Sequence, residues 1–262
     1  MSDTIRIFIG SEPKTRVPAH VLVYTIKKYT KNPTEIHIME PGGDQGYWQK
    51  PKDLRMGTGF SLFRWMIPKY LDYKGKAIYL DADQIVFHDV LDLWTKDEQV
   101  PGPSEVWCAY ENDKYFKNPG KPGMQSSVML IDCEKASYWK EEWMWSQMRK
   151  GICNYGMFMH QVWGKFPANR IECEWNQNNK HIPGKTKLLH YTREQSQPWY
   201  NIHHKFAITW EKILIEAIKA GFVPKDELTT AIARFGKPDA GDRRRTFGIH
   251  PQYRRVLSAY DE

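Results

Sequence analysis

The feature that most constrains the fold of this chain is a short apolar run that ends in two carboxylates, AIYLDADQIVF at residues 77–87. Its length and apolar content predict a buried strand of a parallel sheet. Side chains alternate along an extended chain, so Asp81 and Asp83 should point the same way, roughly 6–7 Å apart at Cα. Carboxylates at the carboxyl end of such a strand lie where open α/β sheets bind their ligands. The run therefore predicts both a fold class and the position of a site.

The two acids indicate a site for a divalent cation. Two like charges held so close together cost free energy unless a cation lies between them. Hard oxygen ligands suit Mg²⁺ or Mn²⁺, which keep coordination positions open for the phosphates of a substrate. On this interpretation Asp81 and Asp83 hold a metal that grips a nucleotide diphosphate. A strand followed by an acidic turn without a metal is the alternative that these residues leave open.

The size and composition of the chain favour one α/β domain with a sizeable core. The chain has 262 residues, of which 41% are hydrophobic. We expect the domain to span residues 1–235 and a basic extension, without clear periodicity, to follow at 236–262. The four cysteines are widely separated and contain no C-x-x-C pair, so neither a zinc site nor a disulfide framework is predicted.

The charge pattern bears on the partners and on the location of the protein. The net charge is +7, and Lys and Arg are spread along the chain apart from the arginines at 243–245 and 254–255. Phosphate-bearing substrates fit this charge, whereas the clustered basic and aromatic motif of a nucleic-acid binder is missing. The basic C-terminus could make peripheral contact with an anionic membrane, but a solvated tail is the favoured alternative. Without a signal-peptide pattern or an 18-residue apolar run, a cytoplasmic location is expected.

Local patterns predict strands alternating with helices, the order of a nucleotide-binding α/β unit. Strands are expected at 5–9, 35–39, 77–81, 106–110, 127–132 and 187–191. Helices are expected at 17–29, 62–71, 88–94, 134–148, 154–165, 210–220 and 225–234, with a polar, Gly-rich loop at 41–59. Ser61 should cap the helix at 62–71, and Pro68 should bend or divide it. Arg64 lies amid apolar neighbours, so it either extends to the surface, the favoured alternative, or points into a site needing a cation.

Several blocks of sequence together resemble glycosyltransferase family eight, the glycogenin-like and bacterial galactosyltransferase-like group. The first are FRWMIP at 63–68, YLDAD at 79–83 and DVLDLW at 89–94. MQSSVMLID at 124–132 resembles the FNSGVmliN block of that family, and residues 190–199 resemble its HFxGxxKPW block. The resemblance runs from about residue 5 to about residue 200, with the blocks in order.

The resemblance implies a GT-A fold, a Rossmann-like mixed sheet flanked by helices, in a single α/β domain. It also implies a nucleotide-sugar donor, usually a UDP-hexose, a Mn²⁺ or Mg²⁺ cofactor, and transfer with retention at the anomeric carbon. The acceptor would be a saccharide, a lipid-linked glycan or a protein side chain. Asp81 and Asp83 would ligate the metal, with Asp81 also near the donor, and His190 would be the third protein ligand.

The resemblance further implies how the donor is bound. Arg64 would contact the donor diphosphate or sugar, and the backbone around Ile9, Gly10 and Ser11 would hold the uridine. The lysine of the family's last block is Gln197 here, so another basic residue must substitute for that cation, or binding is weaker.

The floor of the predicted site departs most from the family. The family's Asn is Gln125 here, its Gly is Ser127, and its Asp-Gln pair beneath the sugar has no clear counterpart. Gln125 and Gln161 are the candidate catalytic residues, although Gln161 also fits the surface of a helix. Trp175, in a segment before His190, could stack on an acceptor sugar or lie in the core.

Other functions remain open on the sequence. A nucleotide-sugar-binding protein without transfer activity would keep the same pocket, and the missing Asp-Gln pair and Gln197 are compatible with it. A nucleotidyltransferase shares the carboxylate-bound metal, but residues 10–14 are a poor version of the Gly-rich basic loop that it needs after its first strand.

Overall fold

The structure is a computed structural model that describes residues 4–49, 51, 53–54, 58–110, 124–159, 168–192, 196–238 and 246–261. Its helices are α1 (Arg16–Tyr29), α2 (Gly43–Gly46), α3 (Ile67–Tyr70), α4 (Leu91–Trp94), α5 (Lys96–Gln99), α6 (Glu141–Arg149), α7 (Tyr155–Met159), α8 (Ala207–Lys219) and α9 (Lys225–Ala233). Its strands are β1 (Ile5–Gly10), β2 (Thr34–Met39), β3 (Lys76–Asp81), β4 (Gln84–Val86), β5 (Val106–Tyr110), β6 (Met124–Asp132), β7 (Asn169–Ile171), β8 (Gln177–Asn178), β9 (Leu188–His190), β10 (Lys237–Pro238) and β11 (Thr246–Phe247). Short 3₁₀ helices lie at Pro13–Thr15, Phe63–Trp65, Lys135–Tyr138 and Cys173–Asn176, and a longer one at Pro251–Tyr260.

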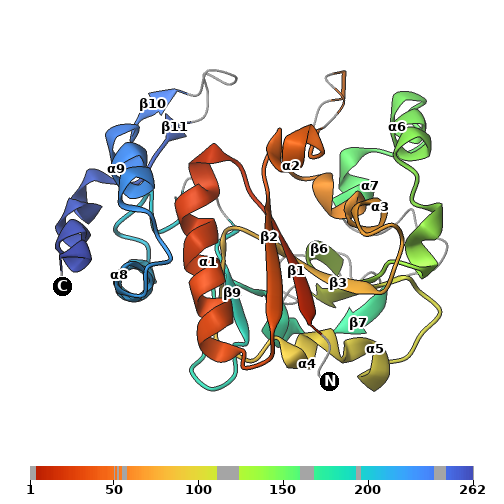
Figure 1. Ribbon diagram of the computed structural model, residues 1–262, viewed down its shortest axis with the longest axis horizontal. Coiled ribbons are helices and arrows are strands. Elements are labelled where there is room, and N and C mark those ends of the chain that lie inside the picture. The colour runs from red at the N-terminus through yellow and green to blue at the C-terminus, as the bar shows by residue number, and fades with distance from the viewer. Residues whose placement is uncertain are drawn as a thin grey trace.

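A six-stranded mixed sheet forms the centre of the molecule, in the order β2-β1-β3-β6-β5-β7 (Figure 1). β1 runs parallel to β2 and β3, whereas β6 runs antiparallel to both of its neighbours, β3 and β5. The acidic strand β3 therefore lies inside the sheet, with one parallel and one antiparallel partner. The mixed α/β architecture predicted from the sequence is confirmed.

The two faces of the sheet follow from the alternation of apolar side chains. In β1, the side chains of Ile5, Ile7 and Ile9 enter one hydrophobic cluster, and Phe8 enters the cluster on the other face. Helix α1 packs against the first of these faces, while α3, α6 and α7 contribute to the second cluster. Successive side chains of a strand point to opposite faces of the sheet. Because both faces are buried here, most positions of these strands are apolar.

Gly10 brings the end of β1 close to the tip of β3. It pairs with Asp81 in the parallel register. A Cβ atom at this position would lie 2.3 Å from Tyr79 Oη and 2.6 Å from a ring carbon of Phe60. Real side chains do not approach so closely, so glycine is required here for packing beside the acidic strand.

A second, three-stranded sheet, β4-β9-β8, carries the predicted histidine to the acids. β4 follows the acidic turn directly, and it pairs antiparallel with β9 so that Gln84 lies opposite His190. Tyr191 N–H donates to Asp83 O at 2.9 Å, which fixes the end of β9 against the turn. The antiparallel pairing thus places a side chain from late in the chain beside the tip of β3.

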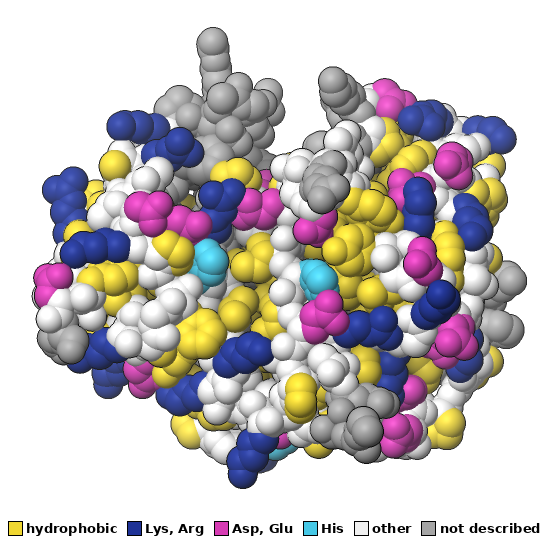
Figure 2. Space-filling model, in the orientation of Figure 1, with side chains coloured by type: hydrophobic (Ala, Val, Ile, Leu, Met, Phe, Trp, Pro, Cys, Tyr) yellow, Lys and Arg dark blue, Asp and Glu magenta, His cyan; other side chains and the backbone are white. Residues whose placement is uncertain are grey.

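The C-terminal part packs on the outer side of α1. Helices α8 and α9 and the 3₁₀ helix at Pro251–Tyr260 lie on that side of α1 (Figure 1). They share a third hydrophobic cluster, in which Trp210 and Tyr253 are buried. The residues 249–260 are thus an ordered part of the packing, whereas the arginines at 243–245 lie outside the described residues. On the face seen in Figure 2, basic and acidic side chains are interspersed.

Several expected helices are shorter than predicted. The helix expected at 62–71 is two pieces, Phe63–Trp65 and α3, with Pro68 near the start of the second; the Ser61 hydroxyl does not cap it but accepts from Thr58 N–H at 3.2 Å. The helix expected at 134–148 is divided into Lys135–Tyr138 and α6.

Local hydrogen bonds and apolar packing account for the other differences. The helix expected at 88–94 is limited to α4, because Asp89 Oδ1 accepts from Leu91 N–H at 2.9 Å and starts it there. Of the helix expected at 154–165, α7 covers 155–159, and 160–167 lie outside the described residues. The expected loop at 41–59 contains α2 and the fully buried Trp48.

Candidate functional site

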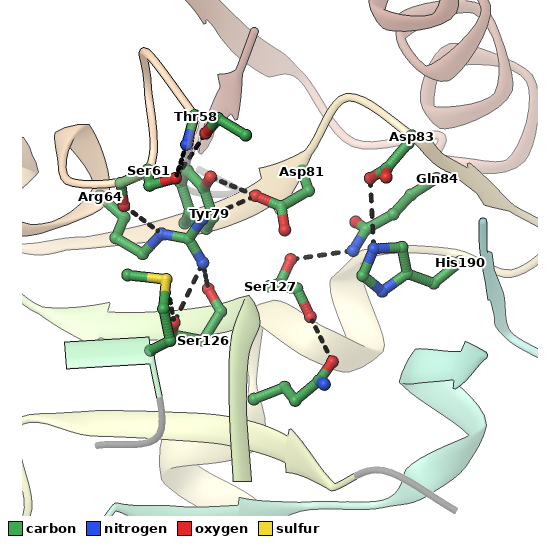
Figure 3. A network of polar contacts seen from close by, with 12 residues as sticks. Thr58, Ser61, Arg64, Tyr79, Asp81, Asp83, Gln84, Ser126, Ser127 and His190 are labelled. Atoms are coloured by element: carbon green, nitrogen blue, oxygen red, sulfur yellow. Dashed lines mark hydrogen bonds and ion pairs between the residues drawn. The ribbon is translucent and has the colours of Figure 1, made fainter. Parts of the chain in front are cut away.

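Three side chains converge beside the tip of β3. Asp81 ends that strand, Asp83 lies in the turn that follows, and His190 ends β9. One ligand atom from each lies within 4.8 Å of the others, and His190 Nε2 is 3.2 Å from Asp83 Oδ1 (Figure 3). Two carboxylates and an imidazole at this separation can bind one divalent cation.

Asn176 fixes the orientation of the imidazole. Its Oδ1 lies 2.8 Å from His190 Nδ1, and its Nδ2 donates to Ser127 Oγ at 3.1 Å and to Gln125 Oε1 at 3.4 Å. With the amide nitrogen directed at those acceptors, the carbonyl oxygen accepts from His190 Nδ1–H. Nε2 is then the ring nitrogen that faces Asp83 and the one that a metal would take. A histidine that ligates through Nε2 donates from Nδ1 in this way, so the chemistry of the donor set fits a metal.

Replacement of Asn176 by leucine should weaken metal binding about tenfold to a hundredfold, because an outer hydrogen bond to a ligating histidine contributes that much. Asn176→Asp keeps an acceptor for Nδ1–H and should bind metal better than Asn176→Leu. The dissociation constant for Mn²⁺ can be measured by titration calorimetry, with His190→Ala as the lower limit. An unchanged constant in Asn176→Leu would show that the imidazole is held without this bond.

Arg64 is buried beside Asp81, so the surface position favoured from the sequence is wrong. Its side chain is only 4% exposed, and its Nη2 donates to Asp81 Oδ1 at 2.9 Å. Nε donates to Ser61 O at 2.9 Å, and Nη1 donates to the backbone oxygen and hydroxyl of Ser126. Its Cζ lies 4.3 Å from the centre of the Tyr79 ring. The break in the helix after Trp65 turns this side chain inward instead of outward.

The surroundings of Asp81, Arg64 and Tyr79 shift the pKa values of all three side chains. Burial raises the pKa of Asp81, Arg64 opposes that rise, and the nearby Asp83 adds to it. Burial lowers the pKa of Arg64, but Asp81 and Tyr79 outweigh burial, and the guanidinium pKa lies above its ordinary value. Burial also holds the pKa of Tyr79, whose hydroxyl donates to Asp81, well above its usual range. Two acids that repel each other in a partly buried position favour an added cation.

The cluster opens on two adjoining cavities. The larger has a volume of about 380 Å³ and is lined by all three cluster residues together with Arg64 and Gln125. The smaller, of about 180 Å³, is lined by Asp83 and Gln197 but by neither Asp81 nor His190. We call them the large chamber and the small chamber. Their shared border includes Asp83, so a ligand spanning both would pass the cluster.

Of the other residues predicted to bind the donor, only Gln197 lines one of the two chambers. Ile9, Gly10 and Ser11 are buried at the carboxyl end of β1, and they line neither chamber. Gln197 lines the small chamber, where its Nε2 donates at 2.8 Å both to Asp83 Oδ2 and to a backbone oxygen. Gln161 lies outside the described residues.

The interior of the site also contains residues that sequence reasoning missed. Asn176 and Ser126 were not predicted as site residues, and a hydrophobic strand pattern gives no signal for Tyr79 as a partner of Asp81. Trp175, for which stacking on a sugar was an alternative, is fully buried in the core, and its Nε1 donates to Asp92 Oδ2 at 3.2 Å. Among the described residues, no helix is long and apolar enough to cross a membrane.

Comparisons with known proteins show the family to which the chain belongs. No protein-family model matches the chain. The chain is 32% identical to Protein CDI of Arabidopsis thaliana over 234 residues, which cover 78% of this chain and 84% of that protein.

Two solved structures show the fold. One is the galactosyltransferase LgtC in complex with donor and acceptor sugar analogues, with a TM-score of 0.60 and 12% identity over 80% of this chain and 95% of that one. The other is the apo form of the glycosyltransferase GlyE of Streptococcus pneumoniae TIGR4, with a TM-score of 0.57 and 15% identity over 85% of this chain and 65% of that one. The chain therefore has the GT-A fold of glycosyltransferases and belongs to the same family as Protein CDI of Arabidopsis thaliana.

Proposed function

We propose that the protein is a metal-dependent glycosyltransferase that transfers a hexose from a UDP-linked donor to a saccharide or lipid-linked glycan, with retention at the anomeric carbon. The observation that carries the proposal is the group Asp81, Asp83 and His190 in the wall of a chamber that Arg64 also lines. The same fold is found in LgtC, which was solved with donor and acceptor sugar analogues. A resemblance to family eight in the blocks around these residues agrees with it.

The residues at the cluster suit the charge that sugar transfer generates. A departing nucleoside diphosphate gains negative charge as its bond to the sugar breaks. A bound Mn²⁺ or Mg²⁺, held by Asp81, Asp83 and His190, would supply positive charge at that position. Arg64 adds a protonated guanidinium to the wall of the same chamber, next to Asp81. Such fixed charges stabilise the transition state more than the ground state, so no strong protein acid is required.

The large chamber has groups suited to a sugar. Ser61 Oγ lies 3.0 Å from the Tyr155 hydroxyl, and both residues line the chamber together with Gln125. The Oε1 atom of Gln125 is engaged by Ser127 Oγ and Asn176 Nδ2, each at 3.4 Å. The described residues supply no acceptor for the amide nitrogen of Gln125, which could then donate to a sugar oxygen. With this chamber about 380 Å³ in volume, a hexose and part of an acceptor fit within it.

The same geometry argues against a glycoside hydrolase. Hydrolases need two carboxyl groups about 5–9.5 Å apart that flank the bond, one of them as a proton donor. Asp81 and Asp83 are the described acids that line the large chamber, and each offers an oxygen to the same group of ligand atoms. With a cation between them, neither carboxylate can donate the proton. The site thus supports transfer of an activated sugar.

A thermal-shift panel of nucleotide sugars with Mn²⁺, followed by an assay for UDP release, tests the proposal. A cognate donor at a hundredfold its dissociation constant should add about 2.7 kcal/mol to the free energy of unfolding. Metal-dependent release of UDP, abolished by a chelator and restored by Mn²⁺, is the expected result. Binding without any turnover over a panel of acceptors would favour the nucleotide-sugar-binding protein instead. No stabilisation by any nucleotide sugar would contradict both.

Peripheral contact with an anionic membrane through the C-terminus is a separate part of the proposal. The support for it is the basic composition of the tail. One of its arginines, Arg255, is engaged with Glu211, to which its Nε donates at 2.6 Å, and Arg254 is exposed. A lipid-linked acceptor would be reached from the cytoplasmic face.

A further inference from the structure

Lys14 is a buried cation in the wall of the small chamber, and the proposed transfer assigns it no role. It lies in the 3₁₀ helix Pro13–Thr15, directly after β1, and its side chain is only 3% exposed. Its Nζ lies 3.0 Å from Glu12 Oε1. Lysine is almost never buried to this extent unless it is paired, here with Glu12, because its ammonium group is strongly hydrated in water.

The position of Lys14 relates it to the candidate site. It lines the small chamber together with Asp83 and Gln197. The small and large chambers share Thr58, Phe60, Asp83 and Thr192 among their lining residues, so they adjoin at Asp83. Among the described residues that line the two chambers, the lysines and arginines are Arg64 in the large chamber and Lys14 in the small one.

A count of charges shows what the small chamber would contribute. Asp81 and Asp83 would balance the charge of a divalent cation, which leaves Arg64 as the further positive charge of the large chamber. In the small chamber the charge of Lys14 is matched by that of Glu12. Arg64 also uses its donors on Ser61, Ser126 and Asp81. The diphosphate of a nucleotide sugar carries two negative charges and gains a third on cleavage. Charge-assisted hydrogen bonds from a second cation would stabilise that group where it leaves the cluster.

We propose that the Lys14 ammonium binds the diphosphate of the donor from the small chamber, while the transferred sugar occupies the large chamber. This inference rests on the proposed function, because it assumes a nucleotide-sugar donor at the cluster. Glu12 holds the ammonium in place through its 3.0 Å contact. Gln197 cannot supply this charge, since it is neutral and its amide nitrogen donates to Asp83.

The alternative to be tested is a purely structural role. Lys14 also borders a hollow of about 240 Å³ against α9, where Asp226 and Glu227 lie. If Lys14 only holds the segment after β1 against α9, its replacement would lower the stability of the fold. The affinity of the protein for phosphate groups would then stay unchanged.

The test measures three dissociation constants by calorimetry, for Mn²⁺ alone, for UDP with Mn²⁺, and for inorganic pyrophosphate with Mn²⁺. In Lys14→Met, the constants for UDP and pyrophosphate should rise about tenfold to a hundredfold, as expected for loss of a charged hydrogen bond. The constant for Mn²⁺ alone should stay the same. Lys14→Arg keeps the charge and should restore most of the affinity. Lys180→Met, at an exposed position outside both chambers, is the matched control.

The outcomes separate this inference from the proposed function. Unchanged affinity of Lys14→Met for pyrophosphate would overturn the role of Lys14, even if the protein transfers sugar. A parallel loss of Mn²⁺ affinity and of cooperative unfolding would assign Lys14 a structural role and overturn it as well. Lys14-dependent binding of pyrophosphate without turnover of any nucleotide sugar would support the inference and contradict the proposed transfer.

Discussion

Replacement of Asp83 by asparagine should abolish metal-dependent release of UDP while leaving the protein folded. Asp83 borders both chambers, and its carboxylate faces His190 Nε2 at 3.2 Å. A neutral amide is a poor ligand for a hard divalent cation, so several kcal/mol of transition-state stabilisation should be lost, on the order of a thousandfold in rate. The fold should persist, because an amide oxygen can still accept the 2.8 Å hydrogen bond from Gln197. Initial rates with and without added Mn²⁺ measure the effect.

The matched control is Asp89→Asn, which removes the same charge outside the cluster. Asp89 starts α4 by accepting from Leu91 N–H at 2.9 Å, and an asparagine can accept that bond too. The Asp89→Asn variant should release UDP as fast as the unsubstituted protein. Full activity of Asp83→Asn in the presence of a chelator would refute a metal mechanism at this site.

Replacement of Arg64 by methionine should destabilise the protein by about 3–5 kcal/mol, because it leaves the partly buried Asp81 carboxylate without its partner. The backbone oxygen of Ser126 would lose its donor in the same change. Loss of the guanidinium should be more damaging in a chelator than in Mn²⁺, since a bound cation would compensate the charge of Asp81. Urea unfolding followed by circular dichroism, in both conditions, measures these free energies.

A double-mutant cycle with Asp81→Asn shows whether the unpaired charge is the cause. Arg64→Met combined with Asp81→Asn should be less destabilised than the sum of the two single variants, because neither buried charge remains. Arg149→Met removes an exposed arginine that pairs with Asp53 and should change the free energy of unfolding little. Additivity of the two changes at 64 and 81 would mean that the ion pair contributes nothing.

Much of the fold could be predicted from local patterns. The strands at the start of the chain alternate apolar residues with a period of two, and α1, α8 and α9 have one apolar stripe each, so these elements fall near the predicted ranges. The interrupted helices could not be located so well. In the segments at 62–71 and 134–148, packing of large aromatic side chains, among them Trp65 against Trp139 with ring centres 4.8 Å apart, determines the backbone instead of helical periodicity.

The candidate site was predicted unevenly. Asp81 and Asp83 follow from a strand pattern, and His190 followed from resemblance, and the structure brings all three side chains together. Local patterns could not place Arg64, because its neighbours in sequence are apolar whether it points outward or inward; only the resemblance implied a role at the donor. Asn176 was not predicted because its partners, His190 and Ser127, come from different parts of the chain and meet only in three dimensions.

The residues of the cluster come from two different sheets, and this affects the stability of the protein as well as catalysis. Asp81 ends a strand of the central sheet, whereas His190 ends a strand of the three-stranded sheet. A single ion held by both would act as a cross-link that closes a long loop of chain, much as a disulfide does. Loss of the ion would then loosen the three-stranded sheet at the same time. The shelf life of purified protein should accordingly depend on the chelating strength of its storage buffer.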